Sequence, residues 1–349
     1  MEALRRAIAS GSLAHAYLIT GPDGIGKGTL AHRLAQTLIS PRIGSEQGAD
    51  DPTIPDLTTR VARQIEADEM PDIERIALGG VCDESNHDHE KDNSTRIRIC
   101  QVRRLERVAS LAPFASPRRI FIIDTADQLQ TEASHALLKT LEEPPGEVLI
   151  LLLATDPDAL LPTIRSRCQE IPLRPAPYSD LLAALEADEE VAEPQTLARL
   201  AHGRYGLAMR MKQDPTFAVL RETATTEARR LARASRNERF DFAERFGSAW
   251  YRERASVLQT IDLWREWWRD VLVAAADAAA DVSPEARAEA THCTPADALR
   301  ALRAVQTARE HLLANTHAQL ALEVMMMDLP VLSGTAPAGR EAREPVTAE

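Results

Sequence analysis

The first half of the chain alternates short apolar runs with longer segments in which apolar residues recur at helical spacing. Helical spacing covers residues 26–38, returns from Ile99 onward, and appears again over residues 131–143, where two prolines stop it. Strands that alternate with helices form a parallel sheet with helices on both faces, so the pattern predicts an α/β domain over residues 1–175. The apolar runs that predict its strands are residues 16–20, 73–78, 118–124 and 147–155.

The pattern changes after this domain, because no further strand-like run persists and the rest of the chain is helical in character. Polar breaks fall at residues 203–206 and 212–215, and the second of these is the better boundary. We therefore expect a small helical lid over residues 176–212 and an all-helical domain over residues 213–332. Residues 333–349, rich in Ala, Gly, Pro and Glu, are expected to form a disordered tail.

Composition and charge narrow the class of protein. The 349 residues carry 53 acidic and 41 basic side chains, a net charge of −12, so the chain lacks the overall basic signature of a protein that wraps nucleic acid, although a local basic patch is allowed. No apolar stretch is long enough to span a bilayer, and no signal peptide is apparent. Four scattered cysteines without a Cys-x-x-Cys pair indicate a reducing compartment. Together with the lack of an apparent span or signal peptide, they predict a cytoplasmic protein with no membrane partner.

The segment GPDGIGKGTLA, residues 21–31, nearly matches a phosphate-binding loop. It follows the first predicted strand and opens a predicted helix, whose amino-terminal N–H groups and dipole favour phosphate. The residue after Lys27 should carry a hydroxyl for Mg²⁺, but Gly28 stands there and the hydroxyl comes one residue later, on Thr29. The candidate nucleotide-binding residues of the loop are Gly21, Gly24, Gly26, Lys27, Gly28 and Thr29.

An acid ends the third predicted strand, at a position where phosphate-loop proteins hold Mg²⁺. This residue, Asp124, is followed by Thr125, which cannot act as the carboxylate that polarises an attacking water. Asp127 lies three residues beyond Asp124 and is expected to point away from the water site. Together with Gly28, these departures predict that ATP or ADP binds weakly or not at all, that Mg²⁺ binds only with nucleotide, and that hydrolysis is weak or absent.

Cys82, His87, His89 and Cys100 offer metal-binding side chains in one polar part of the chain. Their spacing, C-x4-H-x-H-x10-C, matches no standard zinc signature, and acidic residues surround them as in a solvated loop. The sequence therefore predicts that these side chains hold neither zinc nor another metal.

Two further motifs stand out: ALLKTLEEPP at residues 136–145 and SRC at residues 166–168. Together with the phosphate loop they resemble the subunits of bacterial sliding-clamp loaders, over about the first 210 residues of the chain. The resemblance implies an α/β P-loop (AAA+) parallel-sheet domain with a helical lid, followed by an all-α collar that assembles with other subunits. It also implies that Thr155 lies at a nucleotide-sensing position and that Arg167 is an arginine finger that acts in trans on a neighbour's nucleotide.

Within this family, the departures favour the delta-prime type of subunit over the ATP-hydrolysing motor type, tau/gamma. Besides Gly28 and Thr125, Gly206 stands where the motor subunit carries a sensor arginine. The resemblance then implies a DNA polymerase III clamp-loader subunit that joins tau/gamma and delta subunits in a hetero-pentamer. There it helps to open the sliding clamp and to place it on primed DNA, which the chain reaches through the complex.

Two alternatives stay open. The chain is a motor subunit of the same class if Thr29 and a distant acid restore the site, or a non-catalytic phosphate-loop scaffold if only its helical domain binds partners. For Arg167, the alternative to a finger is a surface arginine paired with a nearby carboxylate such as Glu170.

Overall fold

The computed structural model describes residues 2–39, 57–84, 95–276, 282–314 and 316–332. Contacts between residues divide the chain into two compact units. The first comprises Met1–Ala176 and Arg204–Leu207, and the second comprises Pro177–Gly203 and Ala208–Glu349. The tail expected at residues 333–349 lies outside the described residues.

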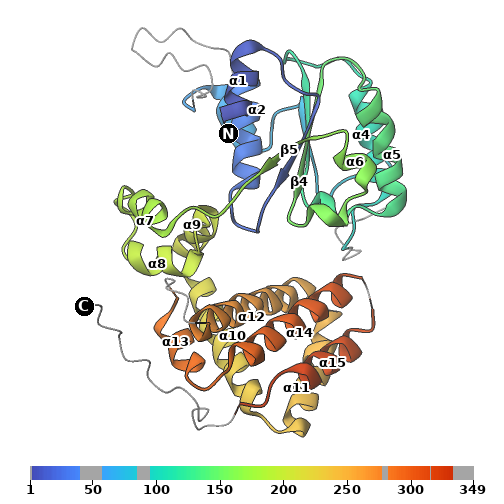
Figure 1. Ribbon diagram of the computed structural model, residues 1–349. Helices are drawn as coiled ribbons and strands as arrows, with labels where there is room; N and C mark the ends of the chain where they lie inside the picture. Colours follow the sequence, from blue (N-terminus) through green and yellow to red (C-terminus); the bar gives the residue numbers. More distant parts are fainter. Residues whose placement is uncertain (1, 40–56, 85–94, 277–281, 315, 333–349) are drawn as a thin grey trace, which may run out of the picture. The chain divides into compact units, whose positions relative to one another are not determined.

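A five-stranded parallel sheet forms the centre of the first unit, with helices on both of its faces (Figure 1). The strand order is β2-β3-β4-β1-β5, so β4 lies between β1 and β3. The predicted parallel α/β fold is confirmed. The strands are β1 (Ala16–Thr20), β2 (Ile73–Ile76), β3 (Arg119–Ile123), β4 (Val148–Ala154) and β5 (Gln169–Pro172).

Both faces of this sheet are buried, as the continuous apolar runs predict. Strand β4 is buried along its whole length, and its successive side chains enter two different apolar clusters on opposite faces. One cluster includes side chains of α4 and α5, and the other includes side chains of α1, α2 and α3. The helices of this unit are α1 (Glu2–Ser10), α2 (Lys27–Ile39), α3 (Arg60–Glu66), α4 (Ile99–Ala109), α5 (Thr131–Glu142) and α6 (Pro162–Arg165).

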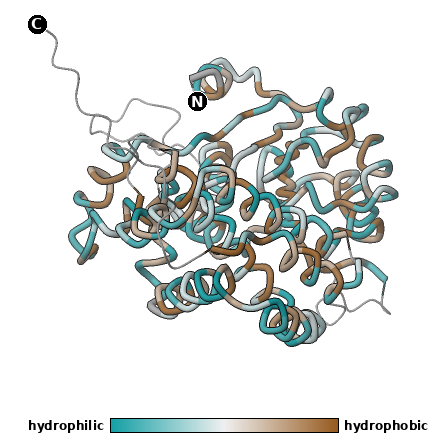
Figure 2. The backbone as a smooth tube through the Cα atoms, turned by 60° about the horizontal axis from the view of Figure 1, so that its bottom comes forward, coloured by the Kyte–Doolittle hydropathy of each residue, from teal (hydrophilic) through white to brown (hydrophobic). Residues whose placement is uncertain are grey.

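The described residues of the second unit contain helices and no strand, as predicted. Hydrophobic and hydrophilic positions alternate every few residues along these helices (Figure 2). Trp264, Trp267 and Trp268 are buried in their shared core, where the Trp264 Nε1–H donates to the Ala224 carbonyl at 2.8 Å. The helices are α7 (Tyr178–Glu186), α8 (Pro194–Ala201), α9 (Tyr205–Gln213, which begins in the first unit), α10 (Pro215–Arg233), α11 (Arg236–Trp250), α12 (Arg254–Ala275), α13 (Pro284–Ala290), α14 (Pro295–Leu313) and α15 (Ala318–Asp328).

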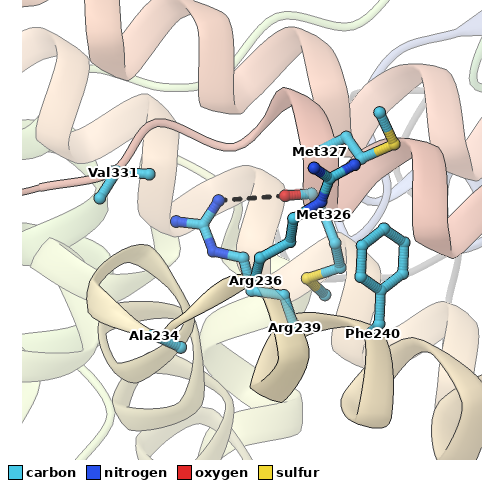
Figure 3. Close-up of a pocket in the computed structure, with 7 residues that line it drawn as sticks. All are labelled: Ala234, Arg236, Arg239, Phe240, Met326, Met327 and Val331. Carbon is cyan, nitrogen blue, oxygen red and sulfur yellow. Dashed lines mark hydrogen bonds between the residues drawn. The ribbon is translucent and has the colours of Figure 1, made fainter.

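A buried arginine joins the ends of two helices in this second unit. Its guanidinium uses all five N–H groups on backbone carbonyls, so Arg239 has no donor left for a ligand in the adjacent pocket of about 330 Å³ (Figure 3). The acceptors lie at the carboxyl ends of α10 and α15, which lack intrahelical partners. They are the carbonyls of Leu231, Ala232, Met326, Leu329 and Pro330.

A buried aspartate fixes the loop that leads into β3. Asp72 directly precedes β2, has a fully buried side chain, and accepts three successive backbone N–H groups. The donors are Phe114, Ala115 and Ser116, at 2.6, 2.7 and 2.8 Å. Burial raises the pKa of Asp72, but its hydrogen bonds together outweigh burial and hold the pKa below the ordinary value.

We expect Asp72→Asn to lower the free energy of unfolding by about 1–3 kcal/mol near neutral pH, because a neutral amide accepts these hydrogen bonds less strongly. A lowered carboxyl pKa stabilises the folded chain above the unfolded-state value of about 3.9, and this contribution is lost as the pH falls through the folded-state pKa. Urea unfolding at a series of pH values should therefore show a weaker acid dependence in the variant than in wild type.

The matched control for this measurement is Glu69→Gln. Glu69 is exposed and makes no ion pair within the described residues, so its loss should leave both the stability and its pH dependence unchanged. An acid dependence of Asp72→Asn equal to that of wild type would contradict the role given to Asp72.

Candidate functional site

The phosphate loop lies between β1 and α2, at the carboxyl edge of the sheet. Lys27 is the first residue of α2, and its ammonium donates to the Gly21 carbonyl at 2.7 Å and to the Pro22 carbonyl at 3.2 Å. It also donates at 3.2 Å to the Thr155 hydroxyl, which follows β4. Gly21 has a φ of 147°, and a Cβ there would lie 2.6 Å from the Leu173 carbonyl, so only glycine fits. The structure thus brings Gly21, Lys27 and Thr155 together.

Asp124, the acid expected to hold Mg²⁺, follows β3 and is paired within the chain. The Arg75 Nη2 donates to its Oδ2 at 2.5 Å, and this hydrogen bond raises the pKa of Arg75. Arg75 comes from β2, which is the neighbour of β3 in the sheet. Thr125 adopts a left-handed φ of 53° and turns its hydroxyl back to the Asp124 carbonyl at 2.6 Å. No sequence pattern predicts a role for Arg75, because its contact with Asp124 depends on the register of two strands.

Asp127 follows Asp124 by three residues and lies close enough to Lys27 for the two charges to interact. That its side chain points away from the water site stays a prediction. Burial raises its pKa, while backbone hydrogen bonds, among them one from Asp156, and the positive charge of Lys27 lower it. Its Oδ2 accepts the Asp156 N–H at 3.4 Å, and its Oδ1 is buried without a hydrogen-bond partner in the described part of the chain. Asp127 is therefore a second acid of the loop region.

A turn at the start of α9 packs directly on the phosphate loop. The Leu207 N–H donates to the Gly24 carbonyl at 3.0 Å, and the buried Arg204 donates to the Asp23 carbonyl at 3.4 Å. A Cβ on Gly206 would lie 2.9 Å from the same Gly24 carbonyl, so a larger residue does not fit without a backbone shift. Gly206, which stands where a sensor arginine was expected in a motor subunit, thus lies in a turn whose backbone is close to the loop.

The residues of this site fit a bound nucleotide only in part. The first N–H groups of α2, which include those of Gly28 and Thr29, have no acceptor within the helix and remain suited to phosphate. Lys27 and Asp124, however, already interact with groups of the same chain. Gly28 supplies no hydroxyl, and no atom lies within 4 Å of the place where its Cβ would stand. The donor set for Mg²⁺ is therefore incomplete.

Arg167 lies in the turn that follows α6 and is paired with Glu142. Its Nη2 lies 2.6 Å from the Glu142 Oε1, and its Nη1 donates to the Thr163 carbonyl at 2.9 Å. Glu170, the alternative partner considered from the sequence, lies 4.0 Å from Arg165 instead. The Arg167 side chain remains about a third exposed, at 34%.

The candidate metal ligands are only partly described. Cys82 lies near Glu84, whose carbonyl accepts from its thiol at 3.8 Å, and Cys100 is buried at the start of α4. Among the described residues, no three His, Cys, Asp or Glu side chains are placed to share a metal ion. His87 and His89 lie outside the described residues. No described helix is both long enough and apolar enough to cross a membrane.

A parallel sheet with a phosphate loop after β1, an acid after β3 and a polar residue after β4 defines a domain of the P-loop class. A sequence profile of the family described as "DNA polymerase III, delta subunit" matches residues 1–177, which is half of the chain. The chain belongs to that family.

Proteins of similar sequence include both delta' and tau subunits of DNA polymerase III. The delta' subunit of DNA polymerase III from Bacillus subtilis (strain 168) is 26% identical over 78% of this chain and 76% of its own length. The delta' subunit from Pseudomonas aeruginosa is 31% identical over 57% of this chain and 56% of its own length. The tau subunit from Escherichia coli K12 is 31% identical over 59% of this chain but only 29% of its own length.

Solved structures give a weaker likeness. A DNA polymerase III gamma subunit-related protein from Thermotoga maritima is 16% identical, with a TM-score of 0.44, over 93% of this chain and 97% of that protein. The Holliday junction branch migration motor RuvB from Thermotoga maritima is also 16% identical, with a TM-score of 0.38.

We expect Gly206→Ala to displace the start of α9 from the phosphate loop, because its Cβ would meet the backbone carbonyl of Gly24. The free energy of unfolding should fall by about 1–3 kcal/mol, the usual range for overpacking. Hydrogen exchange of the Leu207 amide should become faster, because this N–H is shared between the carbonyls of Gly24 and Arg204, both at 3.0 Å, and would lose the first of these acceptors.

Gly28→Ala is the matched control, since an added Cβ there meets open space in the first turn of α2. Alanine is the better helix former, so this variant should be as stable as wild type or more stable by up to about 1 kcal/mol. Equal exchange of the Leu207 amide in Gly206→Ala and wild type would show that the turn does not depend on this close approach.

Proposed function

We propose that this chain is a delta-prime-type subunit of the DNA polymerase III clamp loader, which hydrolyses no ATP itself and supplies Arg167 to a neighbouring subunit's nucleotide. The proposal rests on one observation: both charged groups of the chain's own site are already in contact with groups of the same chain. Lys27 is bound to carbonyls of its own loop, and Asp124 is bound to Arg75. Family membership supports the assignment to the clamp loader.

The absence of hydrolysis in the chain's own site follows from the chemistry that hydrolysis needs. A triphosphate and its Mg²⁺ would have to take Lys27 from the Gly21 carbonyl and Asp124 from Arg75. Even then, Thr125 offers no carboxylate to the attacking water. Removal of one group from such a preorganised site costs several kcal/mol of transition-state stabilisation, so three simultaneous defects support a site without turnover.

The trans role of Arg167 rests on its chemistry and exposure. A guanidinium stays charged and offers a planar fork of N–H donors to phosphate oxygens. About a third of this side chain reaches solvent, where a neighbouring subunit could approach. We propose tau/gamma and delta subunits as the partners in a cytoplasmic hetero-pentamer that loads the sliding clamp onto primed DNA.

A second candidate function is that of an ATP-hydrolysing motor subunit, and one observation favours it. Asp127 lies close enough to Lys27 for the two charges to interact, and its Oδ1 is unpartnered in the described part of the chain. This acid could replace the carboxylate missing at Thr125. Magnesium-dependent ATP turnover by the isolated chain, abolished by Asp127→Asn, would support this candidate over the first.

We expect Arg167→Ala in this chain alone to lower the DNA- and clamp-stimulated ATPase rate of the reconstituted loader by tenfold or more, the scale of an arginine finger. The loader should still assemble, because the substitution removes only a partly exposed side chain. Arg165→Ala is the control, since Arg165 ends α6 two residues before Arg167 but pairs with Asp158 at 2.6 Å. An unchanged rate with Arg167→Ala would show that Arg167 is an ordinary surface residue. The chain would then be a scaffold that takes no part in its neighbour's ATP hydrolysis.

A further inference from the structure

Two motifs that are separate in the sequence meet in one ion pair. The Glu142 Oε1 of the LEEPP motif lies 2.6 Å from the Nη2 of Arg167 in the SRC motif. Nothing in the proposed function requires this contact. It places one residue of the LEEPP motif, Glu142, beside the arginine.

The prolines of the LEEPP motif explain how Glu142 comes to this position. Pro144 and Pro145 cannot continue a helix, and α5 accordingly ends at Glu142. Helix α5 packs against α6, which leads directly into the turn that carries Arg167. Glu142 is therefore the last residue of the helix, and its carboxylate extends from the end of α5 towards the Arg167 guanidinium.

Electrostatics favour an arginine at this point. The carboxyl end of a helix carries partial negative charge, which is unfavourable for Glu142 and favourable for a neighbouring cation. Arg167 meets this end of α5 and also donates from Nη1 to the Thr163 carbonyl of α6. Its guanidinium is thus held by two helices rather than by one flexible contact.

The guanidinium keeps donors that these contacts do not use. Within the described residues the Arg167 Nε–H makes no hydrogen bond, and Nη2 meets only the Glu142 carboxylate, in an ion pair. The guanidinium is thus held in place on one side and keeps unused N–H donors on another. This arrangement preorganises it for an anion that approaches from outside the chain.

We propose that Glu142 is a positioning residue that fixes the guanidinium of Arg167 for the neighbouring subunit's nucleotide. The proposal rests on the proposed function of Arg167. Glu142 is about half exposed, at 50%, so the pair is partly screened by water. Its contribution should therefore be several-fold in rate and smaller than that of the finger itself.

The test uses the complete reconstituted loader, with substitutions in this chain only. Glu142→Gln should lower kcat for DNA- and clamp-stimulated ATP hydrolysis by about two- to fivefold, the effect of one exposed ion pair. Glu143→Gln is the matched control, because Glu143 is an exposed acid next in sequence with no ion pair in the described residues, and it should leave kcat unchanged. Glu142→Asp, which keeps the charge, should restore part of the loss.

The double variant separates positioning from a general effect on structure. If Glu142 acts through Arg167, then Glu142→Gln should cause no further loss when combined with Arg167→Ala. A further loss in the double variant would mean that Glu142 acts by another route and would overturn the proposal. An increased kcat in Glu142→Gln alone would overturn it as well, because the carboxylate would then restrain the finger.

The same measurements distinguish the two proposals. A large loss with Arg167→Ala and a normal rate with Glu142→Gln would reject the positioning role and leave the proposed function intact. A normal rate with Arg167→Ala would reject both.

Discussion

The position of β4 between β1 and β3 is the constraint on which the candidate site depends. Parallel pairing of β1 with β4, and of β4 with β3, brings the loops after all three strands to one edge of the sheet. Lys27, Asp124 and Thr155 come from these loops. The constraint is maintained by burial, because β4 contributes side chains to the apolar clusters on both faces and cannot shift in register without exposing them.

On this scaffold the charged groups are satisfied from within the chain. Arg75 neutralises Asp124, carbonyls of the loop bind Lys27, and Glu142 binds Arg167. These three contacts differ in their surroundings. The first two occupy groups that a nucleotide would need, whereas the third leaves part of a guanidinium exposed. This difference supports the proposal that the chain has a passive site of its own and acts on the nucleotide of a neighbour.

The sequence predicts those features that depend on local pattern. The apolar runs identify β1 to β4, and the glycines and prolines identify the phosphate loop and the end of α5. Strand β5 is missed because three of its four residues are exposed and only Ile171 is buried. The pairing of Arg75 with Asp124 depends on strand register, and the approach of Gly206 to Gly24 involves backbone atoms alone. Neither kind of contact leaves a periodic or compositional signal.

The hydrogen bonds of the buried Arg239 guanidinium limit how far the helical unit can be shortened from its carboxyl end. Three of the five carbonyls that bind the guanidinium belong to Met326, Leu329 and Pro330. The backbone of Leu332 then donates to the Ala232 carbonyl at 2.9 Å. A chain that ends before Pro330 would leave a buried positive charge with too few acceptors, whereas a chain that ends just after Leu332 would retain every one of these contacts. Leu332 therefore marks the natural end point for a minimal version of this unit.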